Sequence, residues 1–507
     1  MNIKIFFTLA LFTTLCSLYA FPLDDFASDR KKPLLGREIV FKDRFTQLPI
    51  EVAITNEISS DAELDSIIYF KHKNYYYKRV YKNLTPEMFG AKGDGVSDDY
   101  KAIQMMLDKG ELGCTFYFDG NKTYYNAFAN DKKWREPLKR NVWQRHRSAK
   151  FLFNGAKLRR RLPEWNDKNL KGNHNEGQFY TDDHTALLYL SGDNYIIDGA
   201  NFNSNVMLGN LLDGDEKPTG NWDYAVGTCM EMGLWLEKCK NVTITNSTFS
   251  NSVFPIYIRY SEKIKMKDIR LSYAAQASKR IHSKDQALGG GVKLQNCKDV
   301  EMSGIFGFRN LNDTVEIESY NSNIKVEGKS ELDYSNSLVI IYSDNVEITN
   351  WTAKNVTSGS GVLIRGGDPL KQTKNISGNI TVDSTSWAGV LVWLLKDAKN
   401  SIDNVKLNIK TSNTGYTGLF LNNESQSQLI KGLNLNHNST RDGIATGNAR
   451  IFNNSLEGIC TGNTYDAIVG VKAKGNNSKK SMRVNLNVGK GFRSKYDIDG
   501  STQLLTK

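Results

Sequence analysis

The sequence predicts an all-β protein whose chain winds into a right-handed parallel β-helix. One short pattern recurs from about residue 150 onward, at a spacing of mostly about 22 to 29 residues between Gly233 and Gly443. Apolar residues alternate with other residues inside each copy, which indicates strands with one buried face. A unit of two or three such strands cannot bury that face alone, so the units are expected to stack as successive coils. The repeat is too short for propeller blades and lacks the signature of leucine-rich repeats.

Two copies show the repeat most clearly, at Gly233–Thr245 and Gly291–Met302. Each begins with a glycine and an apolar alternation, passes a turn that contains a cysteine, and continues into a second strand. Cys239 and Cys297 hold the same turn position in coils that are two windings apart, roughly 9–10 Å, so we expect them to stack without a disulfide.

Composition excludes several classes of protein. The chain of 507 residues is 39% hydrophobic and contains 9 Pro and 41 Gly, which argues against a disordered or collagen-like polymer. No internal run approaches the roughly 20 apolar residues of a membrane span. Lys4, the apolar stretch 5–16 and Ala20 are typical of a signal peptide, so residues 1–20 are predicted to be cleaved and the protein to be secreted or periplasmic.

The mature chain is predicted to contain three parts: an N-terminal leader at 21–83, the β-helix at 84–445 and a strand-rich C-terminal cap at 446–507. Asp98 and Asp99 precede the segment Lys101–Leu107, whose apolar residues fall on one helical face. We expect this helix to cover the N-terminal end of the coils, because open sheet ends would expose pairing edges.

Positive charge is concentrated in one stretch. Twelve Lys or Arg residues and one acidic residue, Glu136, lie between Lys132 and Arg161, whereas the whole chain has a net charge of +11. Trp143, Phe151 and Phe153 are interleaved with these cations. Cations beside flat rings suit an anionic polymer, and export favours an acidic polysaccharide over nucleic acid, which we do not expect as a partner. A solvated basic face is the alternative.

A known family is suggested by the segment 77–99. Its residues Phe89-Gly-Ala-Lys-Gly-Asp-Gly-Val-Ser-Asp-Asp resemble the N-terminal motif of the pectate-lyase-like β-helix superfamily. Within it, the segment is most similar to phage tailspike depolymerases and to the rhamnogalacturonase/epimerase-like pectate lyase group. The resemblance implies the β-helix fold and a polysaccharide ligand. It does not specify the chemistry, because the superfamily contains hydrolases, lyases, epimerases and non-catalytic binders.

Alignment of the copies predicts which side chains point outward. The leucines of Leu234-Trp235-Leu236-Glu237 are expected to point inward, so Trp235 and Glu237 point outward. The same register transferred from coil to coil predicts one outward patch, whose members are Trp235, Glu237, Tyr257, Arg259, Lys293, Glu316 and Glu318, with Arg365 and Trp393 on later coils. Long insertions at about 162–184, 203–228 and 272–290 are candidates to wall this patch.

Three interpretations of the patch are open. Glycoside hydrolysis needs two carboxyl groups, which Glu316 and Glu318 supply, with Arg259 and Lys293 holding substrate. Uronate elimination or epimerisation would use Arg259 or Lys293 as base, with the two glutamates as calcium ligands in that case alone. The third is a salt-bridge ladder that joins Lys293 to Glu316 and Arg259 to Glu237.

The function favoured on these grounds is cleavage of an extracellular, acidic polysaccharide by hydrolysis. Glu316 and Glu318 are the predicted acid and base in unassigned order. Arg259 and Lys293 are the predicted cationic residues, while Trp235, Glu237, Tyr257, Arg365 and Trp393 are predicted to bind sugar. No metal or other cofactor is predicted for the hydrolase. The alternatives are a uronate lyase or epimerase and a non-catalytic adhesin. The outward apolar pairs Val339/Ile341 and Leu391/Trp393 would permit a trimer.

Overall fold

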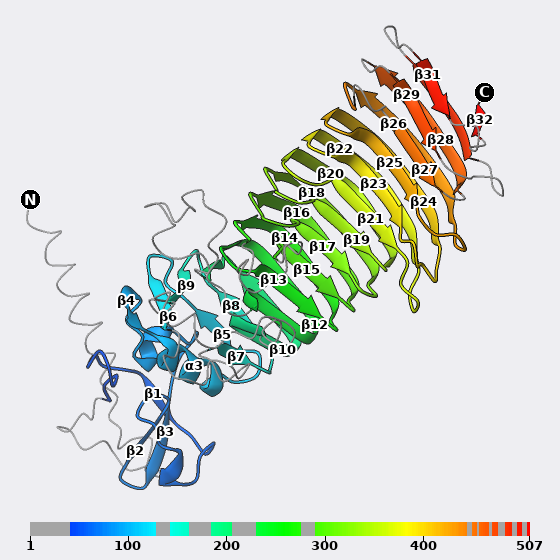
Figure 1. Ribbon diagram of the computed structural model, residues 1–507. Coiled ribbons are helices and arrows are strands. Elements are labelled where there is room, and N and C mark those ends of the chain that lie inside the picture. Colours follow the sequence, from blue (N-terminus) through cyan, green and yellow to red (C-terminus); the bar gives the residue numbers. More distant parts are fainter. Residues whose placement is uncertain are drawn as a thin grey trace, which may run out of the picture.

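The computed structural model describes the residues 41–127, 142–161, 184–204, 230–274, 289–443, 449–453, 456–465, 469–474, 482–488, 494–498 and 504–506. They form an elongated stack of coils, with the sequence running from one end of the stack to the other (Figure 1). The chain is a right-handed parallel β-helix, as predicted. The predicted signal peptide, residues 1–20, lies outside the described residues, as do most of the three predicted insertions.

Each regular coil contains one short strand and one longer, bent strand. The short strands are β13 (Phe254–Arg259), β15 (Val292–Gln295), β17 (Val315–Glu318), β19 (Leu338–Ile341), β21 (Val362–Gly366), β23 (Ala388–Leu394), β25 (Thr417–Asn423), β27 (Ala449–Asn453), β29 (Val469–Lys474) and β31 (Ser494–Ile498). The longer strands are β14 (Glu262–Ser272), β16 (Lys298–Phe308), β18 (Ser322–Glu331), β20 (Asp344–Val356), β22 (Thr373–Thr385), β24 (Ile402–Thr414), β26 (Ile430–Thr440), β28 (Leu456–Tyr465), β30 (Met482–Val488) and β32 (Leu504–Thr506).

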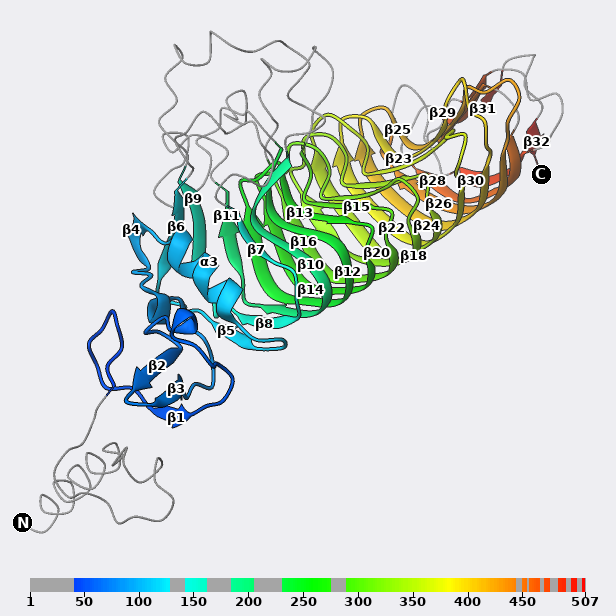
Figure 2. The same ribbon diagram turned by 90° about the horizontal axis from the view of Figure 1, so that it is seen from below.

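The first coils are less regular. Two long strands, β10 (His184–Asp198) and β12 (Met230–Ser250), each run through both parts of a coil. The remaining strands at this end are β4 (Asp94–Asp98), β5 (Thr115–Tyr117), β6 (Thr123–Ala127), β7 (Trp143–Arg145), β8 (Ala149–Leu152), β9 (Lys157–Arg161) and β11 (Asn201–Asn203). Parallel pairing joins every coil to the next, so short strands stack on short strands and long strands on long strands (Figure 2).

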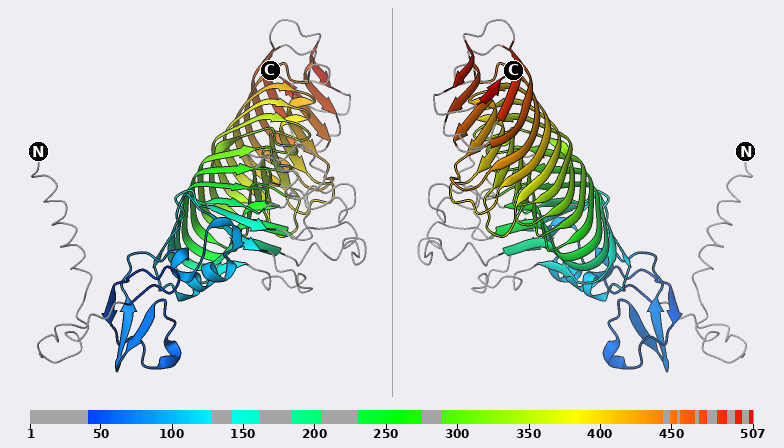
Figure 3. Two further views of the ribbon diagram at one scale, coloured as in Figure 1. Left: turned by 90° about the vertical axis from the view of Figure 1, so that its left-hand side faces the viewer. Right: turned by 90° about the vertical axis from the view of Figure 1, so that its right-hand side faces the viewer.

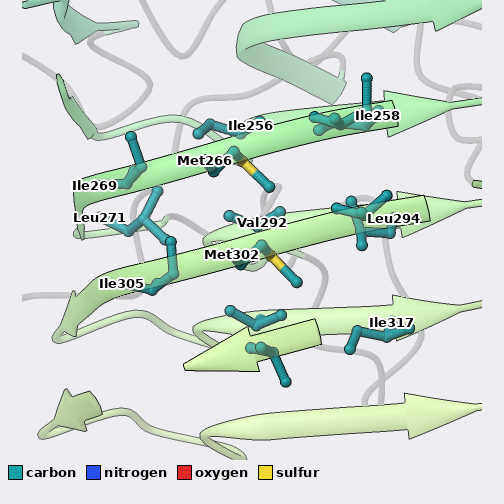
Figure 4. Close-up of a cluster of buried hydrophobic side chains, with 14 of the residues drawn as sticks. Ile256, Ile258, Met266, Ile269, Leu271, Val292, Leu294, Met302, Ile305 and Ile317 are labelled. Atoms are coloured by element: carbon teal, nitrogen blue, oxygen red, sulfur yellow. The ribbon is translucent and has the colours of Figure 1, made fainter. Parts of the chain in front are cut away.

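The lumen of the stack is filled by the apolar residues of the alternation. Ile256, Val292 and Ile317 on the short strands and their equivalents on the longer strands point between the sheets and are fully buried (Figure 4). The glycine at the start of the repeat has a steric reason, since a Cβ atom on Gly291 would lie 2.4 Å from the carbonyl oxygen of Thr314 on the next coil. Cys239 and Cys297 are free and buried, with the Ser261 turn between them, as predicted.

The predicted capping helix is present as α3 (Tyr100–Lys109) at the N-terminal end of the stack (Figure 3). Its residues Ile103, Met106 and Leu107 belong to the same core as the lumen. Asp99 precedes the helix, but its carboxylate accepts hydrogen bonds from the backbone N–H groups of Lys92 and Tyr125. Asp99 therefore braces the glycine turn in front of the helix more than it caps the helix itself.

The basic stretch divides between core and surface where the structure describes it: Arg145, Arg159 and Arg160 are buried, whereas Arg147, Lys150 and Lys157 are exposed. The prediction that rings interleaved with the cations bind a polymer is wrong for the described residues. Trp143, Phe151 and Phe153 are fully buried in the lumen, so their rings cannot stack on a polymer. The buried Arg145 guanidinium donates to the carbonyl oxygens of Leu107, Gly110, Glu111 and Ser148, which satisfies the C-terminal end of α3. The buried arginines therefore give no support to an acidic substrate.

Replacement of Arg145 by Met is expected to destabilise the protein by about 3 kcal/mol, because several buried carbonyl groups lose a charged donor. The free energy of unfolding, measured by urea denaturation, checks this. Lys150→Met is the matched control, since Lys150 is an exposed cation on β8 and its loss should change little. Equal effects of the two substitutions would show that Arg145 does not hold the end of the helix.

The two ends of the chain are built differently from each other. Before the coils, β1 (Val52–Ile54), β2 (Tyr69–His72) and β3 (Tyr75–Arg79) form a separate antiparallel sheet with a small core of its own. After residue 445, β27 to β32 continue the parallel pairing of the preceding coils, so the predicted boundary there does not coincide with an end of the ladder. Within the described residues, no helix is long and apolar enough to cross a membrane.

Candidate functional site

The outward side chains of the short strands form two parallel rows along the stack. The backbone pairing places Lys293 beside Glu316 and Gln295 beside Glu318, and Val339 and Ile341 follow on the next coil. The same register extends back to Trp235 and Glu237 on β12 and forward to Phe420 and Asn422 on β25. The predicted register is therefore confirmed along these eight coils.

The two rows differ in exposure, which the alternation alone does not reveal. One row, here the buried row, contains Trp235, Tyr257, Lys293, Glu316, Val339, Leu363, Leu391 and Phe420. The other, here the exposed row, contains Glu237, Arg259, Gln295, Glu318, Ile341, Arg365, Trp393 and Asn422. All members of the buried row except Lys293 are buried, whereas all members of the exposed row except Ile341 are half-exposed. A ligand on this face would therefore meet the exposed row first.

Lys293, Glu316 and Glu318 form a compact charged cluster in the middle of this face. The Lys293 Nζ atom lies 3.2 Å from Glu316 Oε2 and 2.7 Å from Glu318 Oε2. The side chains of Lys293, Glu316 and Glu318 are 11%, 10% and 22% exposed. The Lys293–Glu316 contact was expected in the salt-bridge interpretation. However, one lysine shared by two nearly buried carboxyl groups is more than a surface ion pair.

The two glutamates of the cluster are shifted in opposite directions. Burial raises the pKa of Glu316 to about 7, although Lys293 opposes the shift. Burial also acts on Glu318, but the charge and hydrogen bond of Lys293 outweigh it and hold the pKa of Glu318 below its usual value. The interaction between the two carboxyl groups contributes to both shifts. Within the pair, Glu316 therefore keeps its proton to a higher pH than Glu318.

Lys293 itself is held in its charged form. Burial lowers the pKa of its ammonium, but the two neighbouring carboxylates outweigh burial and raise it above the usual value. The pKa of Arg259 is raised as well, because a hydrogen bond to Tyr260 and nearby negative groups outweigh burial. Neither cation is thus prepared to accept a proton.

Asp313 is a third carboxyl group near the cluster, and the face assignment missed it. It lies in the turn just before β17 and is buried, and its Oδ1 atom accepts hydrogen bonds from the backbone N–H and the side-chain amide of Asn336, at 3.2 and 3.1 Å. Burial and the charge of Glu316 raise the pKa of Asp313 well above its usual value. The only signal in the sequence was an acidic residue directly ahead of an acidic strand.

The two rings predicted to stack on sugar are almost completely buried. Trp235 is 6% exposed and Tyr257 is 3% exposed. Trp235 packs edge-on against Tyr189 with ring centroids 4.9 Å apart, and Tyr257 stacks on Phe254 at 5.7 Å. Little ring face is left for a ligand. The Arg259 guanidinium lies over the rings of Tyr257 and Tyr260, at 5.9 and 5.0 Å from their centroids.

Beyond Glu318 the outward face becomes a second hydrophobic cluster. Val339, Ile341, Leu363, Leu391 and Phe420 are buried there, and Tyr342, Trp393 and Tyr416 pack against them. The pairs Val339/Ile341 and Leu391/Trp393 were predicted to permit a trimer, and side chains of the same face bury much of them. Trp393 is therefore part of this cluster, with one edge in the exposed row. Trimer formation stays a prediction.

No group of three His, Cys, Asp or Glu side chains within the described residues is arranged to hold a metal ion. The calcium ligands of the lyase alternative therefore stay a prediction. The predicted insertions that would wall the face lie largely outside the described residues.

Residues 225–368 match the family model of a right-handed β-helix region. No curated protein matches the chain. Among solved structures, the family 28 exopolygalacturonase of Yersinia enterocolitica is 12% identical over 84% of this chain and 80% of its own, with a TM-score of 0.44.

Two other solved structures illustrate the range of proteins with this fold. The A-module of the mannuronan C-5 epimerase AlgE4 of Azotobacter vinelandii is 12% identical over 83% of this chain and 99% of its own, with a TM-score of 0.42. The surface adhesin PfbA of Streptococcus pneumoniae is 14% identical over 83% of this chain and 93% of its own, with a TM-score of 0.30. At these identities the similarity concerns the fold and not the activity.

Proposed function

We propose that this right-handed parallel β-helix is an exported polysaccharide hydrolase whose active site is the Lys293–Glu316–Glu318 cluster. The observation that carries the proposal is a pair of neighbouring carboxyl groups on an outward face that share Lys293 but differ in exposure, 10% for Glu316 and 22% for Glu318. Their pKa values are shifted in opposite directions, which agrees with this difference. An acid that keeps its proton near neutral pH beside a carboxylate that has lost it is the pair that glycoside hydrolysis requires. Carboxyl groups with shifted pKa values gather at functional sites.

The two glutamates then have separate roles. Glu316 is the general acid that protonates the leaving sugar oxygen. Glu318 is the base or nucleophile, because it is ionised and is the more exposed of the two. Lys293 keeps Glu318 ionised and holds both carboxyl groups in place. The carboxyl groups of known glycosidases are about 5 Å or more apart. Lys293 holds both carboxyl groups at one ammonium, so they must adjust their separation when a glycosidic oxygen enters between them.

Elimination is less well supported than hydrolysis. A lyase needs a base that is partly unprotonated near neutral pH, and the pKa values of both Lys293 and Arg259 are raised. A lyase or epimerase would therefore need a base other than Lys293 or Arg259. Absorbance of an unsaturated uronate product in the ultraviolet separates the two reactions.

A non-catalytic glycan-binding protein is the second candidate. The observation in its favour is that Lys293 ion-pairs with both carboxyl groups, so all three charged groups already have partners without a substrate. In that case the exposed row alone would bind the glycan, and the cluster would fix its shape.

The pH dependence of cleavage follows from the two shifts. Cleavage should decline as the pH rises through about 7, because Glu316 then loses the proton that it donates. At acid pH it should decline only below the usual range of a glutamate, because the pKa of Glu318 is lowered. A pH–rate profile measures both limbs. An alkaline limb that begins well above neutral pH would remove Glu316 from the role of acid.

The proposed function is tested by incubating the full chain with a panel of capsular and plant polysaccharides, both acidic and neutral. Release of reducing ends without ultraviolet absorbance is the expected result. Reducing ends with matching absorbance would indicate a lyase. Binding to a polysaccharide without any reducing ends, from the wild type and from a Glu316→Gln/Glu318→Gln chain alike, would indicate an adhesin.

A further inference from the structure

Arg365 is the cation of the exposed row that has no acidic neighbour in that row. It lies between Ile341 on one side and Trp393 on the other. Within the described part of the chain its guanidinium forms no ion pair, whereas Lys293 contacts two carboxylates. Arg259 is different again, because Glu237 is its register neighbour and two tyrosine rings lie under it.

Two neighbouring residues of the exposed row each have a buried hydrogen-bond donor without an acceptor. The Nε atom of Arg365 and the Nε1 atom of Trp393 are both buried, and neither has a hydrogen-bond partner among the described residues. Arg365 and Trp393 are paired in register on neighbouring coils, so their Cα atoms are roughly 4.8 Å apart. Buried donors are nearly always satisfied in folded proteins. Both residues are half-exposed, so a small shift of either side chain would open its buried donor to an acceptor on a ligand that lies along the row.

The position of Arg365 relative to the cluster is set by the coil spacing. Glu318, Ile341 and Arg365 follow one another along the exposed row, so Arg365 is two coils, roughly 9.6 Å, from Glu318. Its positive charge also contributes to the lowered pKa of Glu318. The two residues therefore belong to one surface, along which an extended glycan can lie parallel to the axis of the stack.

We propose that Arg365 and Trp393 form a subsite for the acidic group of a glycan that lies along the exposed row. A guanidinium binds a carboxylate through two parallel hydrogen bonds, and the indole N–H adds a third donor. The substrate class is then a polysaccharide with carboxylate groups, such as a uronate, placed about two coil steps from the bond at Glu318. This rests on the proposed function for the location of the cleaved bond, but the subsite is testable by binding alone.

The test measures equilibrium binding by titration calorimetry on the full chain with Glu318→Gln, so that the ligand is not consumed. The probes are hexamers of several polyuronates and the same hexamers with their carboxyl groups reduced to alcohols. Arg365→Gln is expected to weaken binding of an acidic hexamer by about 10- to 100-fold and to leave the reduced hexamer unaffected. The Arg365→Lys chain should bind more tightly than the Arg365→Gln chain but less tightly than the parent, because lysine has the positive charge but lacks the paired N–H donors of a guanidinium. Arg259→Gln is the matched control and should cost less, since Glu237 already offsets its charge.

Three results would overturn the subsite: equal affinity of the Arg365→Gln chain for the acidic hexamer, equally tight binding of the reduced hexamer by the parent chain, or no binding of any polyuronate hexamer. Reducing-end release by the chain with Glu318 intact is read separately. Cleavage that does not depend on Arg365 refutes the subsite and keeps the hydrolase. Binding that depends on Arg365 without any cleavage keeps the subsite and refutes the hydrolase.

Discussion

Replacement of Glu318 by Gln is expected to lower the rate of polysaccharide cleavage by about 10²- to 10⁴-fold. The amide keeps the shape of the side chain but cannot accept a proton or attack a sugar. The rate is measured as reducing ends released from the polysaccharide that the wild-type chain cleaves. Binding of that polysaccharide should change far less, because the charges that hold it lie elsewhere in the exposed row.

The matched control for Glu318 is Glu237→Gln. Both glutamates are half-exposed members of the same row, and three coil steps separate them. Within the described residues Glu237 forms no ion pair with Lys293, so its replacement is expected to weaken binding of the polysaccharide but to change the rate at saturating polysaccharide by only a few-fold. Equal losses from the two substitutions would mean that acidity of the row matters and that the cluster has no special role.

Replacement of Lys293 by Met is expected to destabilise the folded protein by about 3–5 kcal/mol at pH 8, because two nearly buried carboxyl groups lose their shared counter-ion. The loss should be smaller at pH 5. Without Lys293 the folded-state pKa values of Glu316 and Glu318 both rise above their unfolded values, so the folded state takes up protons as the pH falls. Urea denaturation at both pH values gives the free energies of unfolding.

The control for Lys293 is Lys240→Met. Lys240 forms an exposed ion pair with Glu262, and such pairs contribute at most about 1 kcal/mol. A similar small loss for both lysines, with no dependence on pH, would contradict the buried character of the cluster.

The sequence predicts the stacking of distant side chains because every coil obeys the same rule. The inward leucines at 234 and 236 fix the phase of one strand, and a glycine such as Gly291 marks the same point in another coil, where a Cβ atom would strike the next winding. Alignment of the copies therefore predicts that Lys293, Glu316 and Glu318 point outward on neighbouring coils. The backbone pairing places them as predicted.

The burial of an outward side chain cannot be predicted from the same pattern. Alternation shows the direction in which Trp235 and Tyr257 leave the strand, but not that Tyr189 and Phe254 pack against their rings. For the same reason, the repeat pattern does not distinguish the buried row from the exposed row. The repeat pattern does not predict the position of Asp313 either, because turns between strands vary in length and have no alternation of apolar residues.

Composition is also a poor guide to location. The dense positive charge between Lys132 and Arg161 suggested a surface for polymers, yet Arg145 is used to complete the end of a helix and Arg160 is fully buried. A count of cations does not reveal which of them have carbonyl partners inside the fold. On the outward face of the short strands, the expectation of an acidic ligand depends on Arg365 in the exposed row.

The location of a bound glycan tests the account most directly. A crystal structure of the Glu318→Gln chain with a hexamer that it binds should show the sugar chain running along the exposed row, with one glycosidic oxygen within hydrogen-bond distance of the Glu316 carboxyl group. A hexamer bound on the long-strand face, or across the short strands without contact to residues 316 and 318, would contradict the account.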